Sequence, residues 1–392
     1  MKKITKKIRD NFIFDKFNYY DKNNVIFQLG KYHGILDKKG NITWFIETED
    51  LRSIGRGKFI IKVDDKYGII NKDKKYIIEP EYEHLERIFP DKAISKTVFI
   101  ASKNGKYGII NIKNKIIIDF MYDGLQDLCG KFRAEINGKK GIINLKNNIL
   151  IPFEYEDITI VSYFFPNLFE VGKNGKRGII NQKNKVIIPI KYDYIGDLGN
   201  KTLCAENNVI DYKNKIINSD FSHIETLCLL SANEEPLFPA LKNGKMGFID
   251  QYGNIKIDFE YEDCEWFFEG YAEVSKDGIN YGLINSKGEL VLPYEYDDRY
   301  FLKHPDDEWF IISKNNKYGV VDKNNNKIIE FLFEELDYSF GNDLLEAKIG
   351  DTWGIIDLQN KPLTIKKRDL KKLTDSMSNL EKMKLVFNCQ EL

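Results

Sequence analysis

The sequence is poor in the residues that build most catalytic and metal sites. Among 392 residues there are only four histidines, and none pairs with another His or with a Cys at metal-ligand spacing. His-Glu-x-x-His, Gly-x-Ser-x-Gly and Walker A motifs are all absent. We therefore predict no catalytic residue, no metal site and no cofactor. The histidines are His33, His84, His223 and His304.

Cysteine is also scarce, and long apolar runs are missing. The five cysteines are scattered with no Cys-x-x-Cys pair, which favours reduced thiols over a disulfide framework. The basic segment from Met1 to Arg9 is not followed by the apolar core of a signal peptide, and no run approaches the roughly 18 to 20 residues of a membrane span. We expect a soluble cytoplasmic protein. The cysteines are Cys129, Cys204, Cys228, Cys264 and Cys389.

The chain has no excess charge of either sign. Fifty-nine basic residues against sixty acidic ones give a net charge of −1, so no global field attracts nucleic acid or acidic membranes. Lysine–tyrosine pairs such as Lys106-Tyr107 superficially resemble single-strand nucleic-acid sites, but nearby carboxylates offset their charge. We predict neither nucleic acid nor membrane as a partner. Hydrophobic residues at 42% and aromatics at 13% favour an ordered, strand-rich chain.

What the chain does contain is a repeat. Variants of the stretch from Asn104 to Tyr122 recur from about residue 31 almost to the C-terminus, marked by a glycine at steps of about 36 residues. Asn208 takes the glycine's place in one unit, which suggests positive φ, although close packing would also require glycine. The marker glycines are Gly34, Gly68, Gly108, Gly141, Gly178, Gly247, Gly282, Gly319 and Gly354.

A turn signal follows each marker. Two apolar residues come first, then Asn or Asp in all ten units, and three residues later Gly or Asn in nine units, with Lys74 as the exception. An Asx side chain that starts a turn and a left-handed residue that closes it are hairpin chemistry, so we interpret this row as turns rather than as a metal or sugar site. The closing residues are Gly40, Asn114, Asn147, Asn184, Asn214, Gly253, Gly288, Asn325 and Asn360.

An aromatic ring stands fourteen residues after most markers, and a carboxylate usually follows it. Because Phe333 replaces the usual Tyr in one unit and Phe221 serves a degenerate unit, we expect the ring to pack between units and the hydroxyl to be optional. A ligand-binding ladder of Tyr-Asp/Glu pairs is the alternative. The tyrosines are Tyr82, Tyr122, Tyr155, Tyr192, Tyr261 and Tyr296.

Asn-Gly or Asp-Gly dipeptides precede most of the markers. Asn104-Gly105 and Asn137-Gly138 are examples, and such dipeptides are the strongest short hairpin signal in a sequence. Each unit is therefore predicted to hold three strands joined by two tight turns, with a variable linker between the ring and the next unit.

The combined pattern resembles the bacterial WG (Trp-Gly, or KWG) repeat family. The pattern is [Trp/Tyr]-Gly-[aliphatic]₂-[Asn/Asp]-x-x-[Gly/Asn]-Lys-x-[Ile/Val]₂-Pro-x-x-Tyr-[Asp/Glu], over roughly residues 30 to 362. Only Trp353-Gly354 has the tryptophan; tyrosine replaces it in four units, and His33, Lys140, Arg177 and Met246 depart further. The resemblance implies a repeat architecture and an interaction or scaffold role, and no catalytic activity.

The ends of the chain differ from the repeats. Residues 1–27 are aromatic and are predicted to cap the first repeat, residues 28–364 to form the array, and residues 365–392 to form a helical cap. Leu373 to Val386 has helical spacing, with Ser378 and Glu381 as a candidate capping box. We expect this helix to lie on the last repeat, with docking into a partner's groove as the alternative.

Together these patterns predict an all-β array of about ten three-stranded antiparallel units, in a solenoid or superhelical ribbon with a short C-terminal helix. A closed β-propeller is the alternative. For function we predict a non-enzymatic scaffold that binds a protein or peptide through an extended surface. A glycan or cell-envelope binder and a hydrolase with a composite carboxylate site are the alternatives.

Overall fold

The computed structural model describes residues 13–21, 23–88, 97–161, 167–226, 236–297, 302–303, 309–339 and 344–377. The chain divides into two compact units, one of Met1–Ser53 with Glu273–Leu392 and one of Ile54–Ala272. The predicted capping box at Ser378 and Glu381, and also Cys228, Cys389 and His304, lie outside the described residues.

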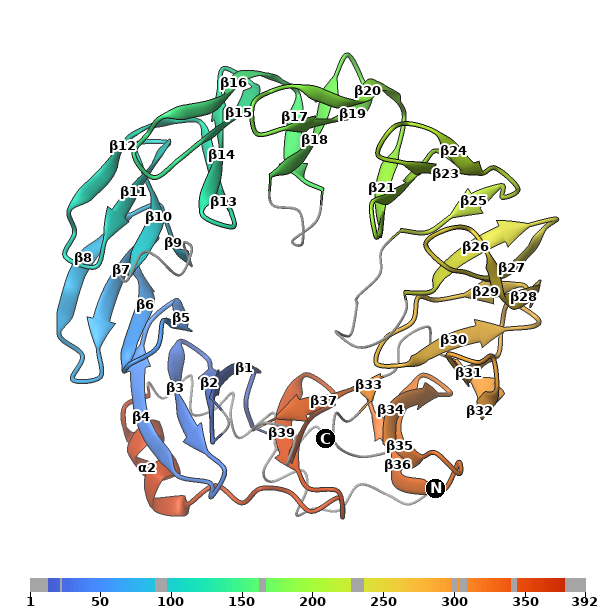
Figure 1. The fold of residues 1–392 in the computed structure, drawn as a ribbon. Coiled ribbons are helices and arrows are strands. Elements are labelled where there is room, and N and C mark those ends of the chain that lie inside the picture. Colours follow the sequence, from blue (N-terminus) through green and yellow to red (C-terminus); the bar gives the residue numbers. More distant parts are fainter. Residues whose placement is uncertain are drawn as a thin grey trace. The chain divides into compact units, whose positions relative to one another are not determined.

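The described residues form ten antiparallel sheets, each built from strands that are consecutive in the chain (Figure 1). Nine sheets have four strands and the last has three. The predicted all-β, repeat-based fold is confirmed, but the predicted three-stranded unit and solenoid are wrong. A meander of four antiparallel strands is the blade of a β-propeller, so the alternative prediction describes these sheets.

The strands of the first five sheets are β1 (Lys16–Asp21), β2 (Asn24–Leu29), β3 (Tyr32–Asp37) and β4 (Ile42–Glu47); β5 (Asp50–Ser53), β6 (Lys58–Val63), β7 (Lys66–Asn71) and β8 (Tyr76–Tyr82); β9 (His84–Ile88), β10 (Val98–Lys103), β11 (Lys106–Asn111) and β12 (Ile116–Tyr122); β13 (Gly124–Leu128), β14 (Lys131–Ile136), β15 (Lys139–Ile143) and β16 (Ile149–Tyr155); β17 (Asp157–Ile160), β18 (Leu168–Lys173), β19 (Lys176–Asn181) and β20 (Val186–Tyr192).

The strands of the other five sheets are β21 (Ile195–Gly199), β22 (Thr202–Ala205), β23 (Asn208–Asp211) and β24 (Ile216–Asn218); β25 (His223–Ile224), β26 (Phe238–Lys242), β27 (Lys245–Ile249) and β28 (Ile255–Tyr261); β29 (Asp263–Cys264), β30 (Tyr271–Ser275), β31 (Tyr281–Asn285) and β32 (Leu290–Tyr296); β33 (Leu302–Lys303), β34 (Trp309–Lys314), β35 (Lys317–Asp322) and β36 (Lys327–Phe333); β37 (Glu335–Ser339), β38 (Leu344–Ile349) and β39 (Thr352–Ile356).

The strand that sequence analysis missed is the first of each sheet. It comes directly after the ring and its carboxylate, where a variable linker was predicted. In β9, Leu85 pairs with Ala101 and is fully buried. Because these first strands have only two to six residues, they are too short for a periodic pattern. The hydrophobic core lies between consecutive sheets; Ile100 and Ile109 of one sheet, for example, pack with Phe132 and Ala134 of the next.

Both predicted turns are confirmed. In the Asn-Gly turn, Asn104 has φ 53° and Gly105 has φ 71°, which is the pair of positive values that a type I′ turn needs. In the Asx turn, the Asn71 Oδ1 atom accepts hydrogen bonds from the backbone N–H groups of Asp73 and Lys75. The closing residue has positive φ in all ten units, including the exceptional Lys74 at 62°.

The marker glycines are required for close packing and not for positive φ. A Cβ at Gly141 would lie 2.6 Å from the carbonyl oxygen of Ile151 in the adjacent fourth strand. Seven further markers from Gly34 to Gly319 give distances of 2.5 to 2.8 Å to the fourth strand's backbone, and none has positive φ. Asn208 is tolerated because its fourth strand, β24, ends at Asn218, before the segment that would pass alongside it.

The recurring ring connects each sheet to the next. Tyr82 is 3% exposed, and its hydroxyl donates a 2.6 Å hydrogen bond to Oδ1 of Asn114, the residue that closes the Asx turn of the following sheet. The hydroxyl was predicted to be optional, but four further tyrosines make the same bond. These pairs are Tyr122 with Asn147, Tyr155 with Asn184, Tyr192 with Asn214 and Tyr296 with Asn325.

Replacing Phe333 with Tyr is expected to stabilise the protein. The next closing residue is Asn360, whose Oδ1 atom is buried without a hydrogen-bond partner. A hydroxyl at Phe333 would supply the donor that the other units have, worth about 0.5 to 1.5 kcal/mol of unfolding free energy. Chemical denaturation measures the gain. Phe221→Tyr is the matched control, because its next closing residue, Gly253, offers no amide; an equal gain in both variants would contradict the explanation.

The N-terminal residues complete the last sheet, within the same unit. Trp353 of β39 exchanges two backbone hydrogen bonds with Phe14, just as Tyr67 pairs with the ring residue Tyr82 elsewhere. Phe14 is 1% exposed. The next residue, Asp15, accepts a hydrogen bond from the backbone N–H of the turn residue Gly30, as the carboxylate after the ring does in five other units. Phe14-Asp15 is therefore the ring and carboxylate that the last repeat lacks.

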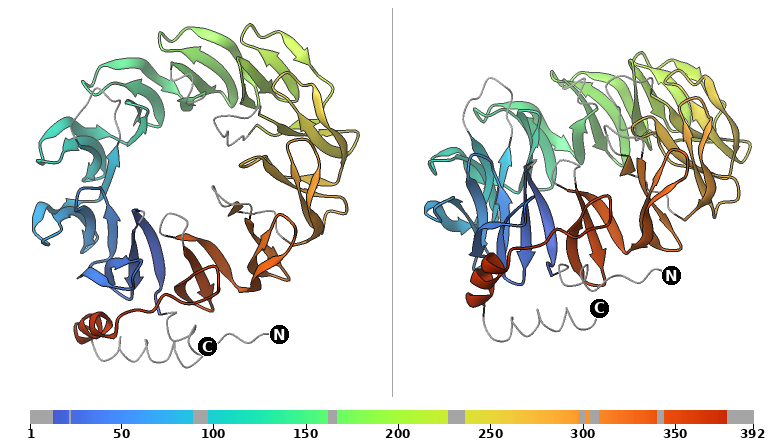
Figure 2. Two further views of the ribbon diagram at one scale, coloured as in Figure 1. Left: turned by 60° about the horizontal axis from the view of Figure 1, so that its bottom comes forward. Right: turned by 90° about the horizontal axis from the view of Figure 1, so that it is seen from below.

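This pairing changes the role of both chain ends. Residues 16–27, predicted as part of a cap, form β1 and the start of β2 in the first sheet. The helix α2 (Lys367–Asp375) begins earlier than predicted and contacts β4 of the first sheet (Figures 1 and 2), while its Leu373 shares a core with Ile355 of the last sheet. Its Leu373 is buried with Tyr32 and Leu36, and the Tyr32 hydroxyl donates to the Ser376 carbonyl. The helix therefore covers the core in which Phe14 is buried.

Candidate functional site

The row of tyrosines and carboxylates is structural and does not form a ligand-binding ladder. The rings are buried, except that Tyr192 is half-buried, and five of the carboxylates accept hydrogen bonds from the backbone of the next sheet's hairpin. Glu83, for example, accepts hydrogen bonds from the backbone N–H groups of Asn104 and Gly105, and these bonds lower its pKa. These tyrosine rings are therefore not available to stack on sugar rings, which weakens the glycan-binding alternative.

Two of the three described thiols and one of the described histidines are buried, whereas Cys129 is a free, exposed thiol. Cys204 and Cys264 are buried and unpaired, and burial raises the pKa of Cys204 to about 12, which keeps it protonated. Burial lowers the pKa of His33, which is 3% exposed. Among the residues that the structure describes, no three His, Cys, Asp or Glu side chains come together as a metal would require.

A pocket of about 380 Å³ lies between the sheets β9–β12 and β13–β16. One wall carries the rings of His84 and Tyr107, whose centroids are 5.7 Å apart. The other wall carries the cations Arg133 and Lys140. Carboxylates stand on both sides, so the pocket is polar and of mixed charge. Its complete lining is His84, Glu86, Tyr107, Asp123, Gly124, Leu125, Gln126, Arg133, Ala134, Glu135 and Lys140.

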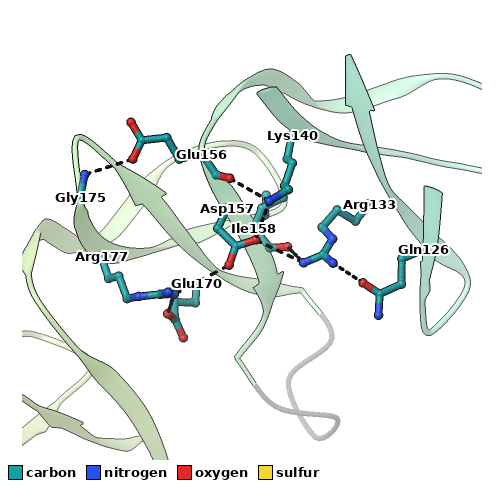
Figure 3. A network of polar contacts seen from close by, with 9 residues as sticks. All are labelled: Gln126, Arg133, Lys140, Glu156, Asp157, Ile158, Glu170, Gly175 and Arg177. Atoms are coloured by element: carbon teal, nitrogen blue, oxygen red, sulfur yellow. Dashed lines mark hydrogen bonds and ion pairs between the residues drawn. The ribbon is translucent and has the colours of Figure 1, made fainter. Parts of the chain in front are cut away.

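A charged cluster adjoins this pocket and centres on Asp157, the first residue of β17 (Figure 3). The Arg133 Nη1 atom lies 3.2 Å from Oδ1 of Asp157 and also donates to the Ile158 carbonyl. The Lys140 Nζ atom lies 3.4 Å from the same carboxylate oxygen. On the other side of the carboxylate, the Arg177 Nη1 atom lies 4.0 Å from Oδ2 of Asp157. One carboxylate thus faces three cations.

The cluster continues through two further polar side chains. Arg133 donates to the Gln126 side chain, and Arg177 donates to Glu170 (Figure 3). Burial raises the pKa of Glu170, while the hydrogen bond and charge of Arg177 oppose that rise. We call Gln126, Arg133, Lys140, Asp157, Glu170 and Arg177 the charged cluster.

Four members of the charged cluster occupy positions that are apolar or aromatic in several other repeats, although Glu346 stands at the position of Glu170 in the last sheet, opposite Ile355. Arg133 pairs across the sheet with Ile142, and Glu170 with Ile179. Ile60, Ile100 and Ile311 fill the same position in three other sheets. Lys140 and Arg177 directly precede the marker glycines Gly141 and Gly178. In five other units the residue at this position is Tyr or Trp. Both positions thus change together, in two consecutive sheets.

In the sequence, Lys140 and Arg177 stand out as departures from the repeat pattern, which we interpreted as divergence of the repeat. No site residue was predicted, so Arg133, Glu170 and Asp157 were missed. For Arg133 and Glu170 the signal is a charge at a position that several other copies keep apolar, whereas Asp157 stands where Asp263 and Glu335 stand in other sheets. That comparison needs the cross-strand register, which the sequence alone does not supply.

A second group of acids lies in the unit that contains both chain ends. Asp337 of β37 and Glu346 of β38 are directly opposite in the register. Burial raises the pKa of Glu346 to about 7; the Asp337 charge adds to the rise, and a 3.0 Å hydrogen bond from Ser339 opposes it. Burial also raises the pKa of Asp337.

Glu346→Gln is expected to flatten the pH dependence of stability. A carboxyl whose folded pKa exceeds its unfolded value stabilises the protein fully below the unfolded pKa and loses that contribution as pH rises through about 7. Between pH 5 and pH 8 the wild type should therefore lose about 2 to 3 kcal/mol of unfolding free energy through the ionisation of Glu346. The variant Glu346→Gln should not show this loss. Denaturant titrations at both pH values measure the difference, and equal slopes with pH would contradict it.

The fold defines the chain as an all-β repeat protein built from propeller-type blades. A family model described as a WG containing repeat matches residues 67–107, 107–139, 141–176, 178–204, 246–278, 281–318 and 318–353. The chain belongs to this WG repeat family, as the sequence pattern indicated. No curated protein matches the chain.

Solved structures are similar only at low sequence identity. A eukaryotic initiation factor matches with 10% identity and a TM-score of 0.49, covering 88% of this chain and 96% of its own. PorZ, a surface component of the type-IX secretion system of Porphyromonas gingivalis, matches with 10% identity and a TM-score of 0.27, covering 90% of this chain and 59% of its own. Neither similarity carries an argument about function. No helix in the described ranges is long and apolar enough to cross a membrane.

Proposed function

We propose that the protein is a non-enzymatic repeat scaffold that binds a protein or peptide partner, and that the pocket with its charged cluster is a site of contact. The observation that carries this proposal is the departure of two consecutive sheets from their own repeat. Geometry accounts for the turns, the markers and the rings, since they recur in nearly every unit. It does not account for Arg133, Lys140, Glu170 and Arg177, because several other sheets fold with aliphatic or aromatic residues there. The last sheet also has an acid, Glu346, at the position of Glu170, but its residue before the marker is the usual Trp353.

Charges at these positions cost stability. Partly burying a charged group is unfavourable unless its partners are well placed, and a well-packed apolar residue is often at least as stabilising. The Arg133 and Lys140 side chains are only about a quarter exposed. A mixed-charge wall with a neighbouring cavity and a Tyr107 ring suits a short polar peptide segment, whose side chains enter the cavity.

The free thiols support a site of action in the cytoplasm, which we include in the proposal. Cys204 and Cys264 are unpaired, as expected for a protein kept in a reducing compartment.

The test is a selection of peptides from a display library on the purified full chain, followed by affinity measurement on two variants. Lys140→Tyr with Arg177→Tyr restores the repeat's usual residue and should keep the fold while weakening the selected peptides about tenfold or more. Met246→Tyr makes the same restoration in a sheet without the charged cluster and should leave affinity unchanged. Selection of no peptide, or equal affinity in all three proteins, would refute the proposal.

A further inference from the structure

Two recurring sets of lysines differ in their partners. Those beside the Asn-Gly hairpins are paired with the carboxylate that follows a ring. The distance from the lysine Nζ atom to the nearest carboxylate oxygen is 2.5 Å for Lys106 and Asp123. It is 2.6 Å for Lys176 and Asp193, and 2.6 Å for Lys245 and Glu262. Lys103 and Lys173 at the adjoining strand ends pair with Glu81 and Glu154. These charges are neutralised within the chain.

The lysines of the Asx turns are different. The turns that join the third and fourth strands of five consecutive sheets, from β7–β8 to β23–β24, hold ten lysines against two acids, Asp73 and Asp211. Eight of the lysines are exposed and make no ion pair within 4.0 Å in the part of the chain that the structure describes. We call these eight the lysine row: Lys75, Lys113, Lys115, Lys146, Lys183, Lys185, Lys213 and Lys215.

The turns lie side by side, one per sheet, in the unit Ile54–Ala272 (Figure 1). Four of the five turns are joined by a hydrogen bond to the ring of the sheet before, as in Tyr82 with Asn114 and Tyr155 with Asn184. Because the same contact recurs from sheet to sheet, the unpaired charges also recur with the period of the repeat. An otherwise balanced protein therefore carries one continuous basic edge.

An exposed apolar residue accompanies the lysines in every one of these turns. It is the first residue of the fourth strand and directly follows a row lysine in four of the five sheets. Each side chain is between 46% and 60% exposed, although most aliphatic residues of the chain are buried. The five residues are Tyr76, Ile116, Ile149, Val186 and Ile216.

We propose that the lysine row and its apolar residues form a docking surface for an acidic, partly apolar segment of another protein. Charge complementarity defines the partner: carboxylates would meet the row lysines, and apolar side chains would cover the exposed aliphatic residues. This inference goes beyond the pocket, since the two surfaces share no residue and are tested by different variants.

Nucleic acid and anionic membrane fit this surface less well. Single-stranded nucleic acid binds through aromatic stacking together with cations, but four of the five exposed residues are aliphatic and the turns contain no arginine. Helices that lie in membrane interfaces favour Trp, Phe and Leu on the apolar side, and none of these is among the five.

The test uses a fluorescein-labelled synthetic peptide in which acidic residues alternate with Leu and Ser, measured by fluorescence anisotropy on the full chain. One variant changes Lys113, Lys115, Lys183, Lys185, Lys213 and Lys215 to Gln. The matched control removes the same charge from the paired set, changing Lys103, Lys106, Lys173, Lys176, Lys242 and Lys245 to Gln. Exposed ion pairs contribute little to stability, so both variants should fold.

The row variant should bind the peptide about tenfold or more weakly with a reduced salt dependence, and the control within about threefold of wild type. A third variant with Ile116, Val186 and Ile216 changed to Ser should lose affinity while keeping the salt dependence. Failure of the peptide to bind, or equal losses in row and control variants, would overturn the proposal. Tighter binding of oligo-dT or phosphatidylserine vesicles, lost in the row variant, would also overturn it and name the other occupant.

Discussion

Phe14→Ala is expected to lower the free energy of unfolding by about 3 to 5 kcal/mol, as for other fully buried phenylalanines. The residue lies before the first strand, where a truncated side chain would ordinarily cost little. The structure places it instead in the ring position of the last sheet, 1% exposed and packed 4.9 Å from the Phe27 ring, centroid to centroid. Loss of the ring would leave a cavity that Trp353, Leu373 and Met377 also border.

Two companion variants make this prediction specific. Phe221→Ala removes the ring from the same position of an internal sheet and should cost a similar amount, since Phe221 is 5% exposed. Phe14→Leu keeps an apolar side chain and should cost much less. Chemical denaturation of all three proteins gives the comparison. A loss below about 0.5 kcal/mol for Phe14→Ala, typical of an exposed site, would contradict the structure.

Gly141→Ala is expected to destabilise the protein by about 1 to 3 kcal/mol, or to shift the strand β16. A methyl group at Gly141 would lie 2.6 Å from the Ile151 carbonyl oxygen and 3.0 Å from the Pro152 carbonyl carbon. Both atoms belong to the backbone, so no side-chain rotation can relieve the contact. The measurement is chemical denaturation of the purified variant.

Gly124→Ala is the control for that experiment. Its new methyl group would lie 3.6 Å from the Glu135 side chain, an ordinary contact, and its φ is not positive. The two variants make the same chemical change in the same sheet, so their difference reports the close approach alone. If both cost the same, the marker glycine is not there for packing, and the explanation for its recurrence fails.

Local features of this fold could be predicted from the sequence because they depend on neighbouring residues. The Asx turn is specified by Asn71 and its own backbone, and the Asn-Gly turn by Asn104 and Gly105. The ring position could be predicted because it stands at a fixed distance from the marker. The meaning of the marker glycine was left open, since positive φ and close packing both select glycine; the fourth strand alone decides between them.

The strand count could not be predicted because the missing strand is short and is followed by a loop of variable length. The pairing of Phe14 with Trp353 joins residues from opposite ends of the chain, although one sequence signal exists. No aromatic residue stands fourteen positions after Gly354, while Phe14-Asp15 stands before the first marker. A missing ring at one end and a surplus ring at the other indicate a repeat whose last unit is completed from the N-terminal side.

The two proposed contact surfaces differ in how far the sequence could identify them. The charges of Lys140 and Arg177 are visible as departures from a pattern, but their convergence on Asp157 depends on packing between two sheets. The lysine row is visible as composition, yet nearly every repeat has lysines. Only the structure separates lysines that form close ion pairs from those that do not; among the row lysines, the charges of Lys213 and Lys215 help to lower the pKa of Asp211.

The measurement that tests the central claim most directly is amide hydrogen exchange at Trp353. The Trp353 N–H group donates a 2.8 Å hydrogen bond to the Phe14 carbonyl, which completes the last sheet from the N-terminal side. Trp353 should be protected in the full chain to the same degree as Tyr67, its equivalent in an internal sheet, and should exchange much faster in a variant that lacks residues 1–15. Rapid exchange in the full chain, or equal protection in both proteins, would contradict the claim that the last repeat is completed by Phe14.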